Sequence, residues 1–207
     1  MLLQRAVASK LRNLAQGSHY SHSIYDPLIF NKMKNLLGGR VKIMITGSAP
    51  ISSEVLNFLK ICFCAPVCEG YGLTESSAAA SLTSTFDPVS GHVGGPLSCI
   101  RVKLRDIPEM SYLSTDENPR GEILFYGNSI FKGYYKNEEK TAEALIDGWL
   151  ATGDVGSIFP NGSIKVIDRA KNIFKLSQGE YIAPEKLENI YIQSPYVAQI
   201  YVHGDSL

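Results

Sequence analysis

Hydrophobic and polar positions in the first 40 residues follow a helical period. Residues 1–17 are basic and amphipathic, which predicts either a helix that ends at Gly17 or a transit peptide, and we favour the helix. Apolar side chains recur at helical spacing through residues 28–37 and stop at Gly38 and Gly39. Two helices are therefore expected before the first strand.

A strand–helix–strand unit follows these helices. Residues 41–46 form a continuous apolar run, the pattern of a parallel strand buried on both faces. Ser52 and Glu54 suit the start of a helix, as a hydroxyl cap and an acid in the first turn, and residues 66–68 begin the next strand. In such sheets ligands bind beyond the carboxyl ends of the strands. The loops 47–50 and 69–75 are therefore candidate site loops.

The pattern changes after residue 95 to short strand-like runs. The runs cover residues 100–105, 122–126, 155–159 and 163–167, and Pro160-Asn161-Gly162 joins the last two as a hairpin. One helix, residues 137–146, interrupts them. This part of the chain predicts a small, mostly antiparallel, barrel-like sheet.

The last forty residues change pattern again. A strand-like run at 173–176 leads to Gly179, Pro184 opens a helix, and residues 197–203 resemble a further strand. We expect an α/β chain in three parts: a parallel-sheet α/β subdomain over residues 1–90, a β-barrel-like subdomain over 91–168, and the start of a small α+β carboxyl-terminal domain over 169–207. A hinge is expected at Asp168–Lys171.

Composition and charge exclude several classes of protein. Twenty basic residues balance twenty acidic ones, so the chain has no electrostatic footprint for nucleic acid. No apolar run reaches transmembrane length. Cys62, Cys64 and Cys68 have metal-like spacing, but they fall on an apolar helix end and the following strand, which favours buried structural thiols; Cys99 stands apart.

The stretch Glu69–Ser77, EGYGLTESS, carries the first candidate chemistry. Gly70 and Gly72 allow close approach of the backbone to a ligand. Tyr71 offers a ring for a base, Thr74 a donor for a phosphate and Glu75 a carboxylate for Mg²⁺. The alternative is a polar loop after a buried strand.

Two more polar residues flank apolar runs near the predicted hinge. Asp154 could accept both hydroxyls of a ribose or could be a turn aspartate bonded to its own backbone. Arg169 could bind a ligand oxygen or pair with Asp168. The residues alone leave both alternatives open.

Taken together, these motifs resemble those of the adenylate-forming enzymes, which include acyl-CoA synthetases, luciferases and peptide-synthetase adenylation domains. YGLTE, GEI…GY, DGWLATGD and IDRAKNIFKLSQGEYIAPEKLENIY occur in the order typical of that superfamily. The last stretch and LGGRVKIMITGSAPIS are most similar to long-chain fatty acyl-CoA synthetases. The resemblance covers residues 26–207.

The resemblance implies a two-step ligase. A fatty carboxylate would attack the α-phosphate of ATP, releasing pyrophosphate, and coenzyme A would then displace AMP from the acyl-adenylate. The partners implied are a long-chain fatty acid, ATP and coenzyme A, with Mg²⁺ as cofactor. A ligase for another carboxylic acid, or a non-catalytic fragment that binds nucleotide or lipid, are the alternatives.

The same resemblance assigns roles to residues. Tyr71 would stack on adenine, Thr74 would bond the α-phosphate, Glu75 would hold Mg²⁺, and Asp154 with Arg169 would bind the ribose. Thr74 and Glu75 would be catalytic. Other residues implied in the nucleotide site, the hinge and the coenzyme A loop are Gly47, Ser48, Ala49, Pro50, Glu69, Gly70, Gly72, Asp168, Lys171, Gly179, Glu180 and Tyr181.

Several parts of the family pattern are not among the 207 residues. They are a phosphate loop ending in Pro-Lys, the lysine of the carboxyl-terminal domain, and the amino-terminal membrane anchor of long-chain members. We therefore expect an incomplete chain that is inactive alone and that would associate with a membrane only through a missing segment. The resemblance leaves endoplasmic reticulum, mitochondrial outer membrane and peroxisome open as locations.

Overall fold

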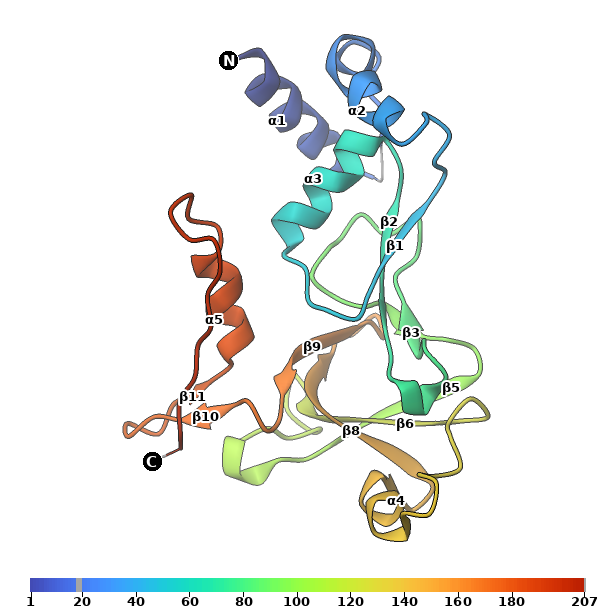
Figure 1. Ribbon diagram of the computed structural model, residues 1–207, viewed down its shortest axis with the longest axis vertical. Coiled ribbons are helices and arrows are strands. Elements are labelled where there is room, and N and C mark those ends of the chain that lie inside the picture. Colours follow the sequence, from blue (N-terminus) through green and yellow to red (C-terminus); the bar gives the residue numbers. More distant parts are fainter. Residues whose placement is uncertain (18–19, 207) are drawn as a thin grey trace. The chain divides into compact units, whose positions relative to one another are not determined.

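A computed structural model describes residues 1–17 and 20–206 of the chain (Figure 1). The chain forms two compact units. The first comprises residues 1–70 and 82–92, and the second comprises residues 71–81 and 93 onward. None of the described helices is long and apolar enough to span a membrane.

Helices dominate the first unit. Its elements are α1 (Leu2–Ala15), the π-helix η1 (Asp26–Phe30), α2 (Asn31–Leu36), β1 (Met44–Thr46), α3 (Ser53–Phe63) and the beginning of β2 (Val67–Tyr71). The start of α3 is as expected, because the Ser52 hydroxyl accepts a hydrogen bond from the Val55 N–H at 3.3 Å. The helix ends at Cys64, whose φ of 52° lies in the left-handed region.

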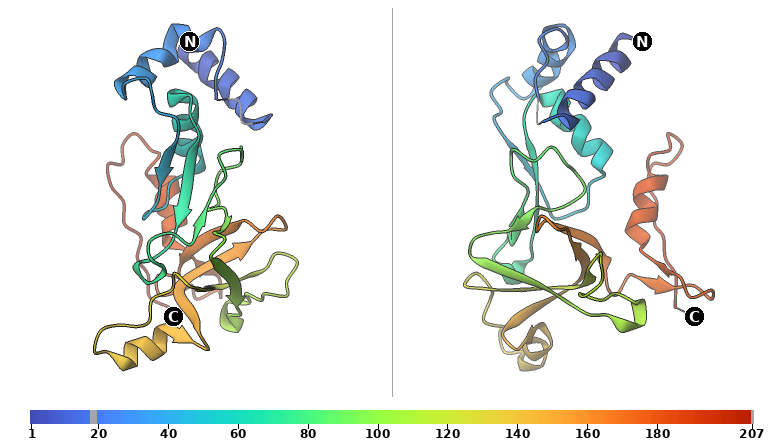
Figure 2. Two further views of the ribbon diagram at one scale, coloured as in Figure 1. Left: turned by 90° about the vertical axis from the view of Figure 1, so that its right-hand side faces the viewer. Right: turned by 180° about the vertical axis from the view of Figure 1, so that it is seen from behind.

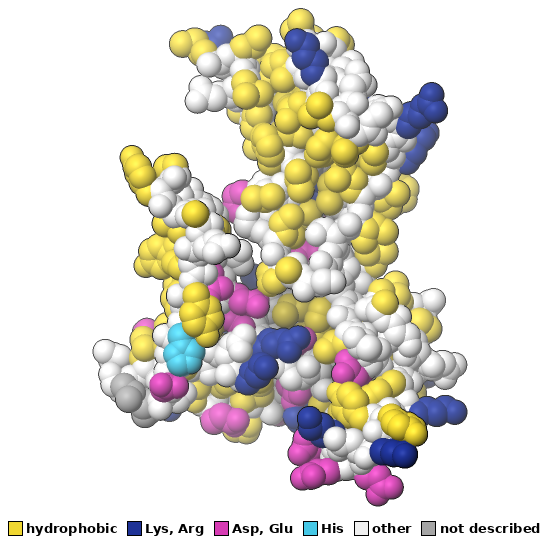
Figure 3. Space-filling model, viewed as in Figure 1, with side chains coloured by type: hydrophobic (Ala, Val, Ile, Leu, Met, Phe, Trp, Pro, Cys, Tyr) yellow, Lys and Arg dark blue, Asp and Glu magenta, His cyan; other side chains and the backbone are white. Residues whose placement is uncertain are grey.

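Strand β1 departs from the sequence prediction. It pairs in parallel with β2, with Thr46 opposite Glu69, but it is shorter than expected and Ile45 is 67% exposed. The predicted burial on both faces is therefore wrong. Within the described chain β1 is the edge strand of its sheet, and no other described strand lies beside its free edge. In Figure 3 hydrophobic side chains also gather on the surface over α3.

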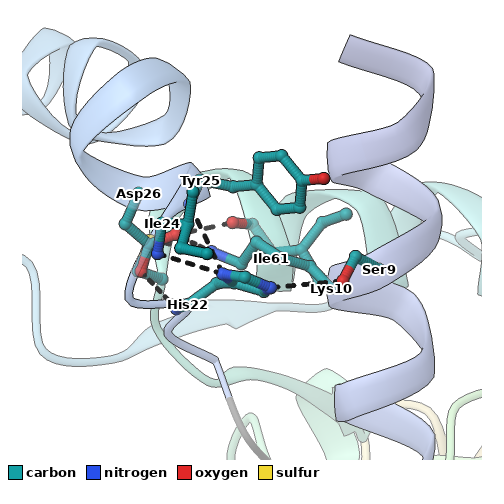
Figure 4. A network of polar contacts seen from close by, with 8 residues as sticks. Ser9, Lys10, His22, Ile24, Tyr25, Asp26 and Ile61 are labelled. Carbon is teal, nitrogen blue, oxygen red and sulfur yellow. Dashed lines mark hydrogen bonds and ion pairs between the residues drawn. The ribbon is translucent and has the colours of Figure 1, made fainter. Parts of the chain in front are cut away.

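A buried ion pair joins α1 to η1 (Figure 4). Lys10 is fully buried and donates to Asp26 Oδ1 at 2.6 Å, and its ammonium lies 4.4 Å from the Phe30 ring centroid. The same Nζ lies 3.1 Å from Cys64 Sγ. Removal of Asp26 alone would leave the buried Lys10 ammonium without its counter-charge, which would destabilise the packing of α1 against η1.

The cysteines are free thiols. Cys62 and Cys68 are buried as expected, whereas Cys64 is half-buried and Cys99 is exposed. Burial raises the pKa of Cys62 to about 11, which keeps it protonated and unreactive at neutral pH. The prediction of buried thiols therefore fits Cys62 and Cys68, and Cys64 only in part.

An antiparallel sheet forms the centre of the second unit. It runs in the order β5-β6-β8-β7, with β9 beside β8, and Figure 2 shows its strands curling. Val93, Ile123, Phe125 and Leu150 belong to the core beneath it. The bounds are η2 (Thr74–Ser76), β3 (Ser81–Leu82), β4 (Gly95–Pro96), β5 (Ile100–Arg105), η3 (Pro108–Met110), β6 (Arg120–Gly127), α4 (Glu138–Ala144), β7 (Leu145–Ile146), β8 (Trp149–Ile158) and β9 (Ile164–Arg169). The expected α/β chain with a barrel-like sheet is confirmed.

The final segment contains β10 (Phe174–Lys175), β11 (Tyr181–Ile182) and α5 (Pro184–Tyr191). The strand predicted at residues 197–203 is wrong. These residues form no strand in the described chain and bend at Ala198, and the Val202 N–H instead donates to Glu188 Oε1 at 2.8 Å. The helix predicted at 137–146 is also shorter, because its last two residues form β7.

Candidate functional site

Two of the predicted site loops lie side by side in the first unit. Gly47 follows β1 and Gly70 lies in β2, and a Cβ placed on Gly47 would lie 3.0 Å from the Gly70 carbonyl oxygen. Ser48, with a φ of 70°, turns the chain through Ala49 and Pro50 into α3. The parallel register brings the two loops together as the sequence predicted.

Glu69 is a buried carboxyl group at the base of these loops. It is 8% exposed, and its Oε2 has no hydrogen-bond partner among the described residues. Burial raises the pKa of Glu69 to about 7, and the Lys60 ammonium acts in the opposite direction. Lys60 is itself buried, donates to Ser90 Oγ at 2.9 Å, and has its pKa lowered by desolvation. The first unit therefore holds two buried ionisable groups near a predicted binding loop.

Tyr71 and Asp154 meet in the second unit. The Tyr71 hydroxyl donates to Asp154 Oδ2 at 2.6 Å, and the ring packs at 5.7 Å from that of Phe125. Burial, and then the neighbouring carboxylate, raise the pKa of Tyr71. Residues 83 positions apart in the sequence are thus joined by a direct hydrogen bond.

Asp154 lies in β8 opposite Arg169 of β9. It is only 5% exposed, and Arg169 Nε lies 3.5 Å from its Oδ1. Desolvation raises the pKa of Asp154, although the Tyr71 hydroxyl and Arg169 act to lower it. The alternative pairing of Arg169 with Asp168 is wrong, since the described ion pair of Arg169 is with Asp154.

The part of β8 just before Asp154 is held by residues that the sequence analysis did not single out. Gly153 has a φ of 72°, and its N–H donates to Glu122 Oε1 at 3.0 Å. The Asp154 N–H donates to Thr152 Oγ1 at 3.1 Å, and that hydroxyl donates to the Ile123 carbonyl at 2.8 Å. Glu122 also pairs with Arg105 across the sheet. In the sequence, only the place of Glu122 in the motif GEI pointed to a role for it.

Glu75 lies in η2 beside the exposed Thr74. The Tyr134 hydroxyl donates to Glu75 Oε1 at 2.6 Å, and the Phe131 N–H donates to the Glu75 carbonyl at 2.8 Å. Tyr134 belongs to the GY of the motif GEI…GY, but the sequence analysis assigned no role to it. Gly72 lies just before η2, where a Cβ would meet the Ala78 carbonyl oxygen at 2.0 Å.

The predicted hinge and coenzyme A loop lie farther along the chain. Asp168 is fully buried, and its carboxylate accepts from the N–H groups of Arg169 and of Glu185 in α5, at 2.7 and 3.1 Å. Lys171 is exposed. Gly179 and Glu180 form the turn between β10 and β11, and the Tyr181 hydroxyl donates to the Glu109 carbonyl at 2.6 Å. Their roles remain predictions.

Comparison with known proteins shows the family to which the chain belongs. A family model described as AMP-binding enzyme matches residues 4–135, more than half of the chain. The chain belongs to the AMP-binding enzymes. The matched region includes Tyr71, Glu75 and Tyr134, whereas Asp154 and Arg169 lie after it.

Individual AMP-binding relatives are similar over most of the chain. Long chain acyl-CoA synthetase 7, peroxisomal, of Arabidopsis thaliana is 53% identical over 99% of the chain, which spans only 29% of that protein. The A domain of carboxylic acid reductase from Segniliparus rugosus, solved with AMP and a co-purified carboxylic acid, has a TM-score of 0.74 and 37% identity, over 90% of this chain and 28% of that one. O-succinylbenzoate coenzyme A synthetase of Bacillus subtilis, solved with ATP and magnesium ion, has a TM-score of 0.68 and 25% identity, over 85% and 38%.

Proposed function

We propose that the chain belongs to a long-chain fatty acid–CoA ligase and carries much of its nucleotide site. The observation that carries the proposal is the group Tyr71, Asp154 and Arg169, a ring and a charged acceptor joined by short contacts. The AMP-binding family and the name of the Arabidopsis relative support the same activity. That name also favours the peroxisome among the three compartments considered.

Asp154 is suited to bind a ribose. A carboxylate has about four lone-pair sites, and in this structure Tyr71 uses one on Oδ2 while Arg169 approaches Oδ1. Two ribose hydroxyls could add to the remaining sites. Because Asp154 is held in place before the ligand arrives, binding would cost little ordering of the acceptor.

Glu75 is suited to hold Mg²⁺. Mg²⁺ is commonly bound by one or two carboxylates together with substrate phosphates, so a single acid beside a phosphate donor such as Thr74 fits it. When bound, the ion would neutralise charge on the phosphate oxygens. We further propose that Gly47–Pro50 and Glu69–Gly72 border the adenine, and that Gly179–Tyr181 approach coenzyme A after rotation at Asp168–Lys171.

The test is Asp154→Asn, in the protein as its source makes it, with acyl-adenylate formation measured as pyrophosphate release. The variant removes the charge from a buried hydrogen-bonding acceptor, so we expect a loss of about tenfold to a hundredfold. Asp147→Asn is the matched control, because Asp147 is exposed, lies in the same motif, and has a φ of 51° that asparagine tolerates.

Undiminished pyrophosphate release by Asp154→Asn would overturn the ribose assignment. A profile of pyrophosphate release against fatty acids of increasing chain length then tests the substrate. We expect the highest rate with long chains, and a maximum with a short or aromatic acid would favour a ligase for another carboxylic acid.

A further inference from the structure

The loop before α4 is fastened to η2 by three hydrogen bonds. Ser77 Oγ donates to the Ser129 carbonyl at 2.8 Å, and the Phe131 N–H donates to the Glu75 carbonyl at 2.8 Å. The third bond joins the Tyr134 hydroxyl to Glu75 Oε1. Only the third bond involves the Glu75 carboxylate. The other two hold the loop that carries Tyr134 close to η2.

Tyr134 is itself held in position. Its ring packs edge-on against Phe131, with 4.9 Å between centroids, and its N–H donates to Thr141 Oγ1 of α4 at 2.9 Å. Gly133 approaches the same threonine so closely that a Cβ would lie 2.6 Å from Thr141 Cγ2. Because backbone and ring are both fixed, the hydroxyl has one preferred direction, toward Glu75.

The bond leaves half of the carboxylate available. Tyr134 occupies Oε1, and the described residues provide no hydrogen bond to Oε2. A donor on one oxygen restricts the rotation of a glutamate side chain and so orients the other oxygen. Residues that orient a metal-binding carboxylate in this way commonly change metal affinity by about 10–100-fold when they are replaced.

We propose that Tyr134 is a positioning residue for Glu75, which its hydroxyl holds with Oε2 directed to a divalent cation. This inference rests on the proposed function, because it assumes that Glu75 binds Mg²⁺. The competing interpretation is a surface contact without consequence, since Tyr134 is 39% exposed. A second alternative is competition, in which the tyrosine must leave before the cation binds.

The chain supplies a matched control. Tyr135 is the next residue, is 89% exposed, and its ring contacts the Lys136 side chain at 5.3 Å rather than a carboxylate. Tyr134→Phe and Tyr135→Phe therefore remove the same atom from adjacent side chains. The Phe131 contact and the bond from the Tyr134 N–H to Thr141 Oγ1 do not involve the tyrosine hydroxyl, so both variants should fold.

The first readout is cation binding without turnover. Mn²⁺, as a probe for Mg²⁺, is titrated into the protein in the presence of a non-hydrolysable ATP analogue, and free Mn²⁺ is measured by electron paramagnetic resonance. We expect Tyr134→Phe to weaken binding about tenfold and Tyr135→Phe to leave it unchanged. Equal or tighter binding by Tyr134→Phe would overturn the proposal, and tighter binding would establish competition.

The second readout is pyrophosphate release as a function of Mg²⁺. Tyr134→Phe should raise the half-saturating Mg²⁺ concentration about tenfold, while excess Mg²⁺ restores the maximal rate. A defect that Mg²⁺ cannot rescue would contradict a positioning role. Glu75→Gln separates the two proposals: if it leaves Mn²⁺ binding unchanged, the metal assignment itself fails, whereas loss with Glu75→Gln but not with Tyr134→Phe overturns only this inference.

Discussion

Glu69 is a buried carboxyl group of the first unit whose charge state should affect folding stability. Its pKa rises from 4.5 to about 7 because the folded protein buries it, so the unfolded chain loses the proton at lower pH than the folded chain does. Folding stability should therefore fall as pH rises from 4.5 to 7. Glutamine carries no charge at any pH. We therefore expect Glu69→Gln to abolish a decrease in the free energy of unfolding on the order of 2–3 kcal/mol between pH 4.5 and 7.

Thermal unfolding at several pH values checks this prediction. Glu117→Gln is the control, because Glu117 is exposed and the substitution should leave the pH dependence as it is. If Glu69→Gln and the unchanged protein lose stability in parallel between pH 4.5 and 7, the burial of Glu69 has no energetic consequence.

The sequence allowed the chemistry of single residues to be predicted better than their partners. Tyr71, Glu75 and Asp154 were identified from residue type and motif order, and the structure gives each a short polar contact. The partners could not be found in the same way. Tyr134 is one of eleven tyrosines, and only the folded loop brings its hydroxyl to Glu75, 59 positions away.

At the scale of elements, the turn from β2 into η2 depends on Gly72. A Cβ there would overlap the Ala78 carbonyl oxygen at 2.0 Å, and that oxygen belongs to the backbone, which cannot move aside as the end of a flexible side chain could. Gly72→Ala should therefore destabilise the chain by about 2 kcal/mol or more. Urea denaturation measures this, with Gly95→Ala as control, because a Cβ on Gly95 meets nothing closer than 3.7 Å. Equal stability of the two variants would show that the turn can relax.

The periodicity of the sequence predicted most helices and strands, but it did not predict which strands pair with one another. The capped start of α3 and the hairpin at residues 160–162 were predicted because their signals are local. The strand expected at 197–203 has a β-like composition, yet a strand also requires a neighbour with free hydrogen-bonding groups. Periodicity also could not show that β1 would be exposed, since exposure depends on which segments cover it.

For the molecule as a whole, the length of the native polypeptide decides what can be assayed. The chain spans 29% of the Arabidopsis relative, so we expect an antibody raised against these residues to detect a species much heavier than 22.7 kDa in the source cells. A species of 22.7 kDa would instead predict nucleotide binding without acyl-CoA synthesis.

The bare edge of β1 has a consequence for handling the chain. An edge beside which no described strand lies, next to an exposed Ile45, is a template for pairing with another copy. Preparations of the 207 residues alone should therefore aggregate more as concentration rises, through intermolecular β-pairing at residues 44–46. Ile45→Lys would oppose such pairing by charge repulsion, without replacing any residue assigned to the nucleotide site.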